Sequence, residues 1–160
     1  MRTLADESAV SVPTIYALVG GRDDVITALM DAGVERFDAG VATLSGRGLF
    51  RATAIVDLFA DIVDHERDLV HALLASGALM SAGREPLLLF HRVRTELKQA
   101  FVEALKDGEL QPGNDPEFAA TSMVRLGMGA FVDWVVSQGD PLTLRAELLR
   151  SLSLVIGACS

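Results

Sequence analysis

Apolar residues recur at intervals of three and four along most of the chain, the spacing that places them on one face of an α-helix. The alternation typical of strands is hard to find. Glycine, proline and Asp-Pro steps divide the pattern into segments of helical length. We expect helices over residues 23–45, 49–75, 86–106 and 117–138, and a last helix after Pro141. The sequence therefore predicts an all-α fold.

The segment at 117–138 is apolar on nearly all sides, which is typical of a helix that is buried all round. Asp115 and Pro116 before it have the residue types of an N-cap and a first helical position. In a chain of 160 residues, one way to bury every side of this helix is to pack it between the core and a partner subunit. We therefore expect a homodimer through residues 116–158. Its expected interface residues are Val124, Met128, Phe131, Leu149, Leu152 and Ile156.

Near the start of the chain, the pattern predicts two very short helices with a tight turn between them. Ser11 offers an N-cap oxygen to the second helix, and Pro13 falls in its first turn, where a missing N–H is tolerated. Apolar residues follow at helical spacing until Gly20 and Gly21, which end the helix. Two such helices make a helix-turn-helix unit, whose second helix enters the major groove of DNA.

In residue types and spacing, this stretch resembles the TetR family of bacterial transcriptional repressors. The family pattern is V-S-x-x-T-x-Y, then a short glycine turn, then a basic residue. It stands here as Val10-Ser11-Val12-Pro13-Thr14-Ile15-Tyr16, Gly20-Gly21 and Arg22. The resemblance implies a partial DNA-binding domain over residues 1–36, containing a truncated helix-turn-helix. It also implies a helical effector-binding and dimerisation bundle over residues 37–160.

The resemblance assigns roles within the motif. Thr14, Tyr16 and Arg22 would contact phosphates. Three further residues, Val12, Pro13 and Ala17, would face base edges, to which they offer apolar contact but no hydrogen bonds.

Two features depart from the family pattern. Ala9 stands where the family usually has glycine. The family's first helix would precede Met1, so we expect that helix to be absent and operator DNA to be bound weakly.

Charge points the same way. The net charge is −8, and the first 24 residues hold two arginines against four acids, a local net charge of −2. Because neutralisation of phosphates supplies most of the affinity for DNA, this front of the chain argues against strong binding by itself.

Composition bears on the cell compartment. The single cysteine, Cys159, forms no internal disulfide. The sequence shows neither a membrane span nor a signal peptide, so we expect a cytoplasmic protein.

Half of the residues are apolar, ample for a core and for a largely apolar effector site among the middle helices. The expected ligand is a small, mostly hydrophobic molecule, and no cofactor or metal is expected. The candidate ligand-binding residues, each of which also suits a plain core position, are Phe59, Ile62, Met80, Phe90, His91, Met123 and Trp134.

Two other functions compete with a ligand-responsive repressor. The acidic front favours a ligand-binding and dimerisation module that does not bind DNA and forms mixed dimers with a full-length partner. A metal-dependent enzyme would use Asp61, His65 and Asp68, whose spacing is far more typical of a solvated helix face. We find neither a nucleophile–base pair nor a metal-binding signature, so we expect no enzyme activity.

Overall fold

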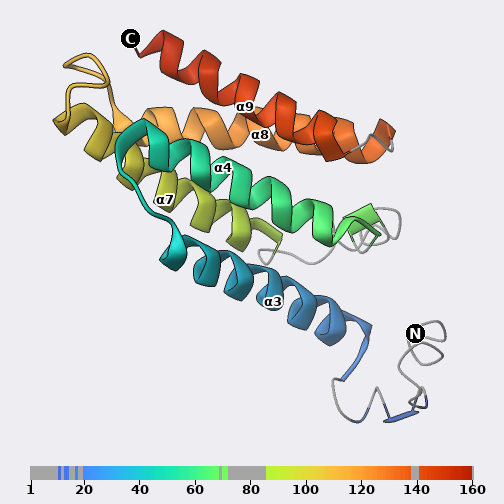
Figure 1. The fold of residues 1–160 in the computed structure, drawn as a ribbon. Helices are drawn as coiled ribbons and strands as arrows, with labels where there is room; N and C mark the ends of the chain where they lie inside the picture. The colour runs from blue at the N-terminus through green and yellow to red at the C-terminus, as the bar shows by residue number, and fades with distance from the viewer. Residues whose placement is uncertain are drawn as a thin grey trace.

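The structure, a computed structural model, is built from α-helices (Figure 1). It describes residues 20–68, 70–71, 86–137 and 141–159, together with Ser11, Pro13, Thr14 and Ala17. These residues contain no strand, which confirms the all-α fold. The five long helices are α3 (Arg22–Thr43), α4 (Gly48–His65), α7 (Pro86–Lys106), α8 (Pro116–Ser137) and α9 (Pro141–Ala158).

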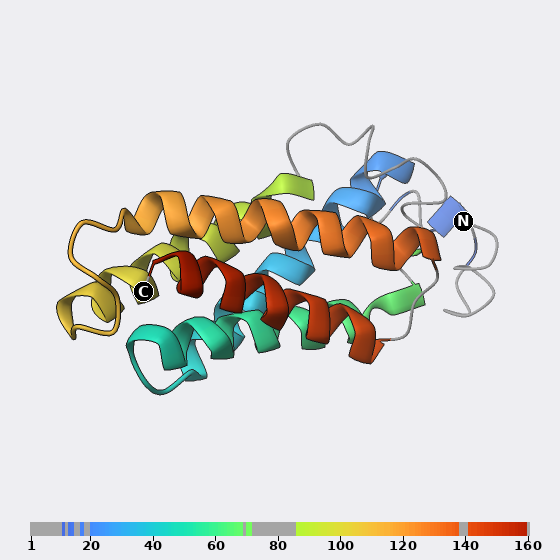
Figure 2. The same cartoon turned by 90° about the horizontal axis from the view of Figure 1, so that it is seen from above.

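Four of these helices form a bundle. α4 packs against α7 and α9, and α8 packs against the same two helices. Seen from above, α8 and α9 run side by side in opposite directions (Figure 2). α3 packs on α4 and α7, on the side of the bundle away from α8 and α9 (Figure 1). Among the described helices, none covers the outer side of the α8–α9 pair.

Several helix boundaries follow the sequence prediction. α7 spans residues 86–106 as expected, and Gly108, with a φ of +77°, follows its end. α8 begins at Pro116, and the backbone N–H of Glu117 donates to Asp115 Oδ1 at 2.9 Å. Asp115 therefore acts as the predicted N-cap.

The predicted helix over residues 49–75 is wrong in its length. α4 ends at His65, and Glu66 caps it with a φ of −101° and a ψ of 21°. The Glu66 carboxylate forms an ion pair with Arg36 of α3. Helical residues resume at 67–68 and 70–71, whereas residues 72–75 lie outside the described part. Hydrophobic spacing reports which side chains are buried and continues across such a break, so it did not locate the end of α4.

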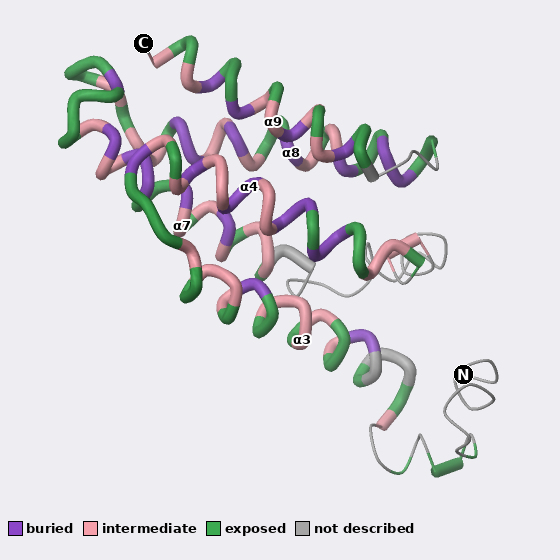
Figure 3. The backbone as a smooth tube through the Cα atoms, in the orientation of Figure 1, coloured by how far each residue is buried: buried purple, intermediate pink, exposed green. Residues whose placement is uncertain are grey.

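The core is entirely apolar. Where the structure describes burial, no buried residue is polar or charged. The largest fully buried side chains come from α3, α4, α7 and α9, so the core extends through the bundle to α3 (Figure 3). They are Phe37, Ile55, Leu97, Phe101 and Leu144.

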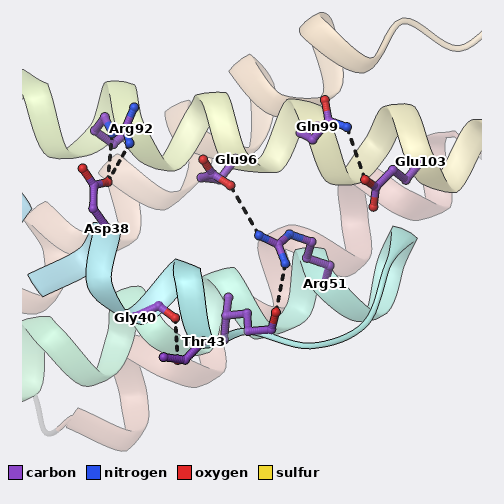
Figure 4. A network of polar contacts seen from close by, with 9 residues as sticks. Asp38, Gly40, Thr43, Arg51, Arg92, Glu96, Gln99 and Glu103 are labelled. Carbon is purple, nitrogen blue, oxygen red and sulfur yellow. Dashed lines mark hydrogen bonds and ion pairs between the residues drawn. The ribbon is translucent and has the colours of Figure 1, made fainter.

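Polar contacts lie at the edges of the bundle, where they join neighbouring helices (Figure 4). The Arg51 guanidinium donates to the Leu44 carbonyl at 3.1 Å and lies 3.7 Å from a Glu96 carboxylate oxygen. Gln99 Nε2 donates to Glu103 Oε1 at 3.2 Å. This hydrogen bond, helped by the nearby charge of Arg47, lowers the pKa of the Glu103 carboxyl below its usual value. The stability contributed by this carboxylate is therefore lost only as the pH falls through the lowered pKa.

The start of α4 depends on a glycine. Gly48 has a φ of +56°, in the left-handed region that side chains disfavour. The neighbouring Leu49 N–H donates to Glu109 Oε2 at 2.7 Å, so this carboxylate caps the helix. A Cβ atom on Gly48 would collide with the same carboxylate.

We expect Gly48→Ala to lower the free energy of unfolding by about 2 kcal/mol. About half of this comes from the positive φ and half from loss of the Glu109 cap. Urea unfolding measures the change. The control is Gly33→Ala within α3, where an added Cβ meets nothing within 4 Å and helix propensity favours alanine by up to about 1 kcal/mol. Equal effects of the two substitutions would contradict this account of the α4 start.

Candidate functional site

Within the motif that the sequence analysis predicts to bind DNA, the described residues include the expected N-cap. The Thr14 backbone N–H donates to Ser11 Oγ at 3.2 Å, and the two hydroxyl oxygens lie 2.7 Å apart. Pro13, Thr14 and Ala17 are exposed, as contact with DNA requires. Val12 and Tyr16 lie outside the described residues. Arg22 is the first residue of α3, but the placement of its side chain is not described.

A glycine turn connects this motif to α3. Gly20 has a φ of +99°, and the Gly21 N–H donates to Asp24 Oδ2 at 2.6 Å. A Cβ atom on Gly20 would collide with the Asp24 carboxylate. The Gly-Gly step therefore permits a sharp turn directly before a helix that its own first-turn acid caps.

α3 links the motif to the bundle without interruption. It runs continuously across residues 36 and 37, the expected boundary between the two domains. Phe37 is fully buried against the bundle. Beside it, Asp38 Oδ1 accepts a hydrogen bond from Arg92 Nε of α7 at 2.9 Å and forms an ion pair with Nη2 of the same guanidinium at 2.8 Å (Figure 4). Phe37 and the Asp38–Arg92 pair therefore connect α3 to the bundle and to α7.

A row of aromatic rings crosses the inside of the bundle. Phe59 of α4 and Phe90 of α7 have ring centroids 5.6 Å apart. Phe131 of α8 lies 6.5 Å from the first ring and 5.8 Å from the second. The row continues to Trp134, 6.4 Å from Phe131, and ends at His71, whose ring lies 5.1 Å from that of Trp134. We call these five residues the aromatic row.

A small apolar cavity lies beside the first two rings of the row. Its volume is about 20 Å³, enough for one water molecule. Sites that enclose small organic molecules have volumes of roughly 300 Å³ or more, so a ligand must push side chains apart to enter here. The cavity is lined by Val56, Phe59, Phe90, Val93, Leu97, Met123, Val124, Gly127 and Leu148.

The structure brings some of the expected ligand-binding residues together. Phe59, Phe90 and Met123 line the cavity, and Trp134 belongs to the aromatic row. Ile62 is a core residue. His91 is exposed on α7, away from the cavity lining, and Met80 lies outside the described residues.

Sequence reasoning missed several lining residues, among them Val56, Gly127 and Leu148, because nothing distinguishes them from other core positions. It also missed His71, whose neighbour Trp134 is distant in sequence.

The expected dimer residues need correction. Phe131 is 9% exposed and Leu152 is 3% exposed, so both belong to the core of the single chain. Val124 lines the cavity, while Leu149 and Ile156 pack half-buried against the core. Met128 is also half-buried. The side of α8 that faces outward is therefore a different one.

Six large apolar side chains of α8 and α9 are exposed instead. They are Phe118, Leu126, Val132, Val136, Leu142 and Leu154, which we call the outer face. Phe118, Leu126 and Leu154 line an apolar groove of about 190 Å³ between the start of α8 and the end of α9. Such a set of exposed apolar residues marks an interaction surface.

One of the candidate metal ligands, Asp61, takes part in an ion pair. Asp61 and Asp57 of α4 both pair with Arg145 of α9. His65 and Asp68 are exposed. Within the described ranges, no three histidine, cysteine or acidic residues are grouped so that they could hold a metal ion.

None of the helices in the described part of the chain is both long enough and apolar enough to cross a membrane. Comparisons of the chain with protein-family models, with curated proteins and with solved structures found no match.

Proposed function

We propose that the chain is a TetR-like, ligand-responsive transcriptional repressor that binds operator DNA as a homodimer. A small, largely apolar effector binds inside the bundle and releases the DNA. The observation that carries this proposal is the continuity of α3. It begins at the glycine turn after the Ser11–Thr14 cap and is held to the bundle by Phe37 and by the Asp38–Arg92 pair.

The path from the effector to the DNA follows from this continuity. Phe90, at the cavity, and Arg92, at α3, lie two residues apart on α7. A ligand that separates Phe90 from Phe59 displaces α7, and Arg92 carries the displacement to Asp38. α3 then shifts relative to the bundle and re-aims the motif at its N-terminal end.

The outer face supports the homodimer. A helix pair that is apolar on its inward side and carries six exposed large apolar residues on its outer side is suited to face a second copy across a two-fold axis. The resulting interface would be a four-helix arrangement of two α8–α9 pairs.

A second function is favoured by charge. Two arginines against four acids in the first 24 residues suit a ligand-binding and dimerisation module that acts without touching DNA. Both proposals share the bundle, the effector and the dimer, and they differ only in DNA binding.

We expect Phe118→Asp to dissociate the dimer. Two-fold symmetry places two copies of the change in the interface, each removing about 1.5–3 kcal/mol of apolar burial. The dissociation constant should rise at least about a hundredfold. Light scattering across a dilution series measures it. Phe50→Asp is the matched control, because Phe50 is 68% exposed on α4 and Phe118 is 66% exposed on the outer face. If both variants remained dimeric, or the unchanged chain were monomeric, the proposed interface would be wrong.

We expect small hydrophobic compounds to raise the melting temperature. A ligand at a hundred times its dissociation constant stabilises the native state by about 2.7 kcal/mol, or about 5–10 °C for a chain of this size. Gly127→Ala should reduce the shift, because its Cβ would fill the cavity and lie 3.1 Å from Leu148 Cδ2. Gly129→Ala is the control, since its Cβ meets nothing within 4 Å. A broad panel of compounds without any shift would argue against the effector role.

A measurement of DNA binding distinguishes the proposed repressor from the proposed module. In a repressor, Thr14→Glu places a carboxylate beside the DNA phosphates and should weaken binding at least tenfold in a mobility shift on the promoter beside the gene. Ser45→Glu adds the same charge in the exposed α3–α4 loop and should leave binding unchanged. Equal binding by both variants would place the DNA contact elsewhere. No retardation of the promoter by the unchanged chain, at low salt as well as high, would establish the module instead.

A further inference from the structure

His71 has an unusual environment at the end of the aromatic row. Its Nε2 atom is buried and has no hydrogen-bond partner among the described residues. A buried polar atom without a partner costs free energy, and such an atom in a native structure calls for an explanation. Its ring lies tilted at 49° against that of Trp134. This nitrogen is therefore shielded from water, in a ring that lies against an indole.

The row gives this nitrogen a connected apolar neighbourhood. Each ring is within 6.5 Å of the next, from Phe59 and Phe90 at the cavity, through Phe131 and Trp134, to His71. Tilted and edge-on rings offer faces and edges that a further aromatic ring can join. An elongated ligand could extend along the row, with an apolar end at the cavity and a polar end at His71.

The charge at the His71 end favours an anion. The guanidinium carbon of Arg67 lies 5.9 Å from the centre of the Trp134 ring, so a fixed positive charge adjoins the ring that His71 contacts. An imidazole N–H donates to a carboxylate, and a charge-assisted hydrogen bond is stronger than a neutral one. A ligand with a neutral polar group would form only the weaker, neutral hydrogen bond.

We infer that His71, with Trp134 beside it, forms the polar anchor of the effector site, and that the effector is an aromatic carboxylate. This inference rests on the proposed effector role of the bundle and adds the chemical class of the ligand. The carboxylate accepts a hydrogen bond from His71 Nε2, and the aromatic body separates Phe59, Phe90 and Phe131.

The probes are 4-phenylbutyrate and its methyl ester, which share an aromatic ring and chain but differ in charge. Calorimetric titration should give at least tenfold tighter binding of the acid. Trp134 is the only tryptophan, so a change in protein fluorescence upon binding locates the ligand at the row. His71→Phe should weaken binding of the acid at least tenfold and leave binding of the ester within about threefold. His91→Phe, which changes an exposed histidine of α7, should alter neither.

The outcomes separate this inference from the proposed function. Equal binding of acid and ester, or unchanged binding of the acid by His71→Phe, would overturn the anchor while the effector role stood. Binding of other hydrophobic compounds but of neither probe would overturn the ligand class. If no compound bound, the effector role itself would fail.

If His71→Phe failed to fold, His71→Gln would take its place, and the comparison of acid with ester on the unchanged chain would still decide. The glutamine retains a hydrogen-bond donor but not the aromatic ring, and should bind the acid with intermediate affinity.

Discussion

The packing of Phe131 and Trp134 between the other helices is the contact on which the rest of the structure depends. Phe131 meets one ring from α4 and one from α7, so a single side chain of α8 fixes the spacing of three helices. This packing also limits the free space beside Phe59 and Phe90 to about 20 Å³. Because interiors pack densely, a ligand at this site would have to push packed side chains apart, and the proposed effector response depends on this requirement.

Ion pairs between neighbouring helices would determine which helices move together. With an apolar core, charged side chains pair at the edges, and the pairs of α3 join it to α4 through Arg36–Glu66 and to α7 through Asp38–Arg92. Such partly exposed pairs contribute little to stability, on the order of 1 kcal/mol or less each. They nevertheless set the direction of α3 once Phe37 has anchored it. α9 is joined to α4 by Arg145, and α4 is joined to α7 by the Arg51–Glu96 pair, so ion pairs connect each of these helices to a neighbour.

The sequence predicted the features that local chemistry dictates. The Asp115–Pro116 start of α8, the span of α7 and the glycine turn before α3 each follow from capping or backbone conformation within a few residues. The sequence did not predict the contacts between segments that are distant along the chain. Because α8 is apolar all round, its pattern did not indicate which side faces the core, and Phe131 was placed at a partner interface. The place of His71 beside Trp134 was not predicted either, since only tertiary packing brings the two rings together.

The effect of a charged residue on the proposed DNA binding depends on its distance from the motif. Interactions between exposed charges are screened beyond about 8 Å at physiological ionic strength. The helices α4, α7, α8 and α9 together hold equal numbers of acidic and basic residues, so the net charge of −8 comes from α3, from the connecting segments and from the start of the chain. The acids that pair with Arg36, Arg92 or Arg145 are neutralised within the fold. The acidic residues near the motif would affect DNA binding far more than those of the bundle. Asp24 is one of them, and it already accepts the Gly21 N–H, so part of its charge serves to cap α3. The balance of acidic and basic residues near Thr14, rather than the net charge of the chain, therefore bears on the choice between the two proposed functions, a repressor and a module that does not bind DNA.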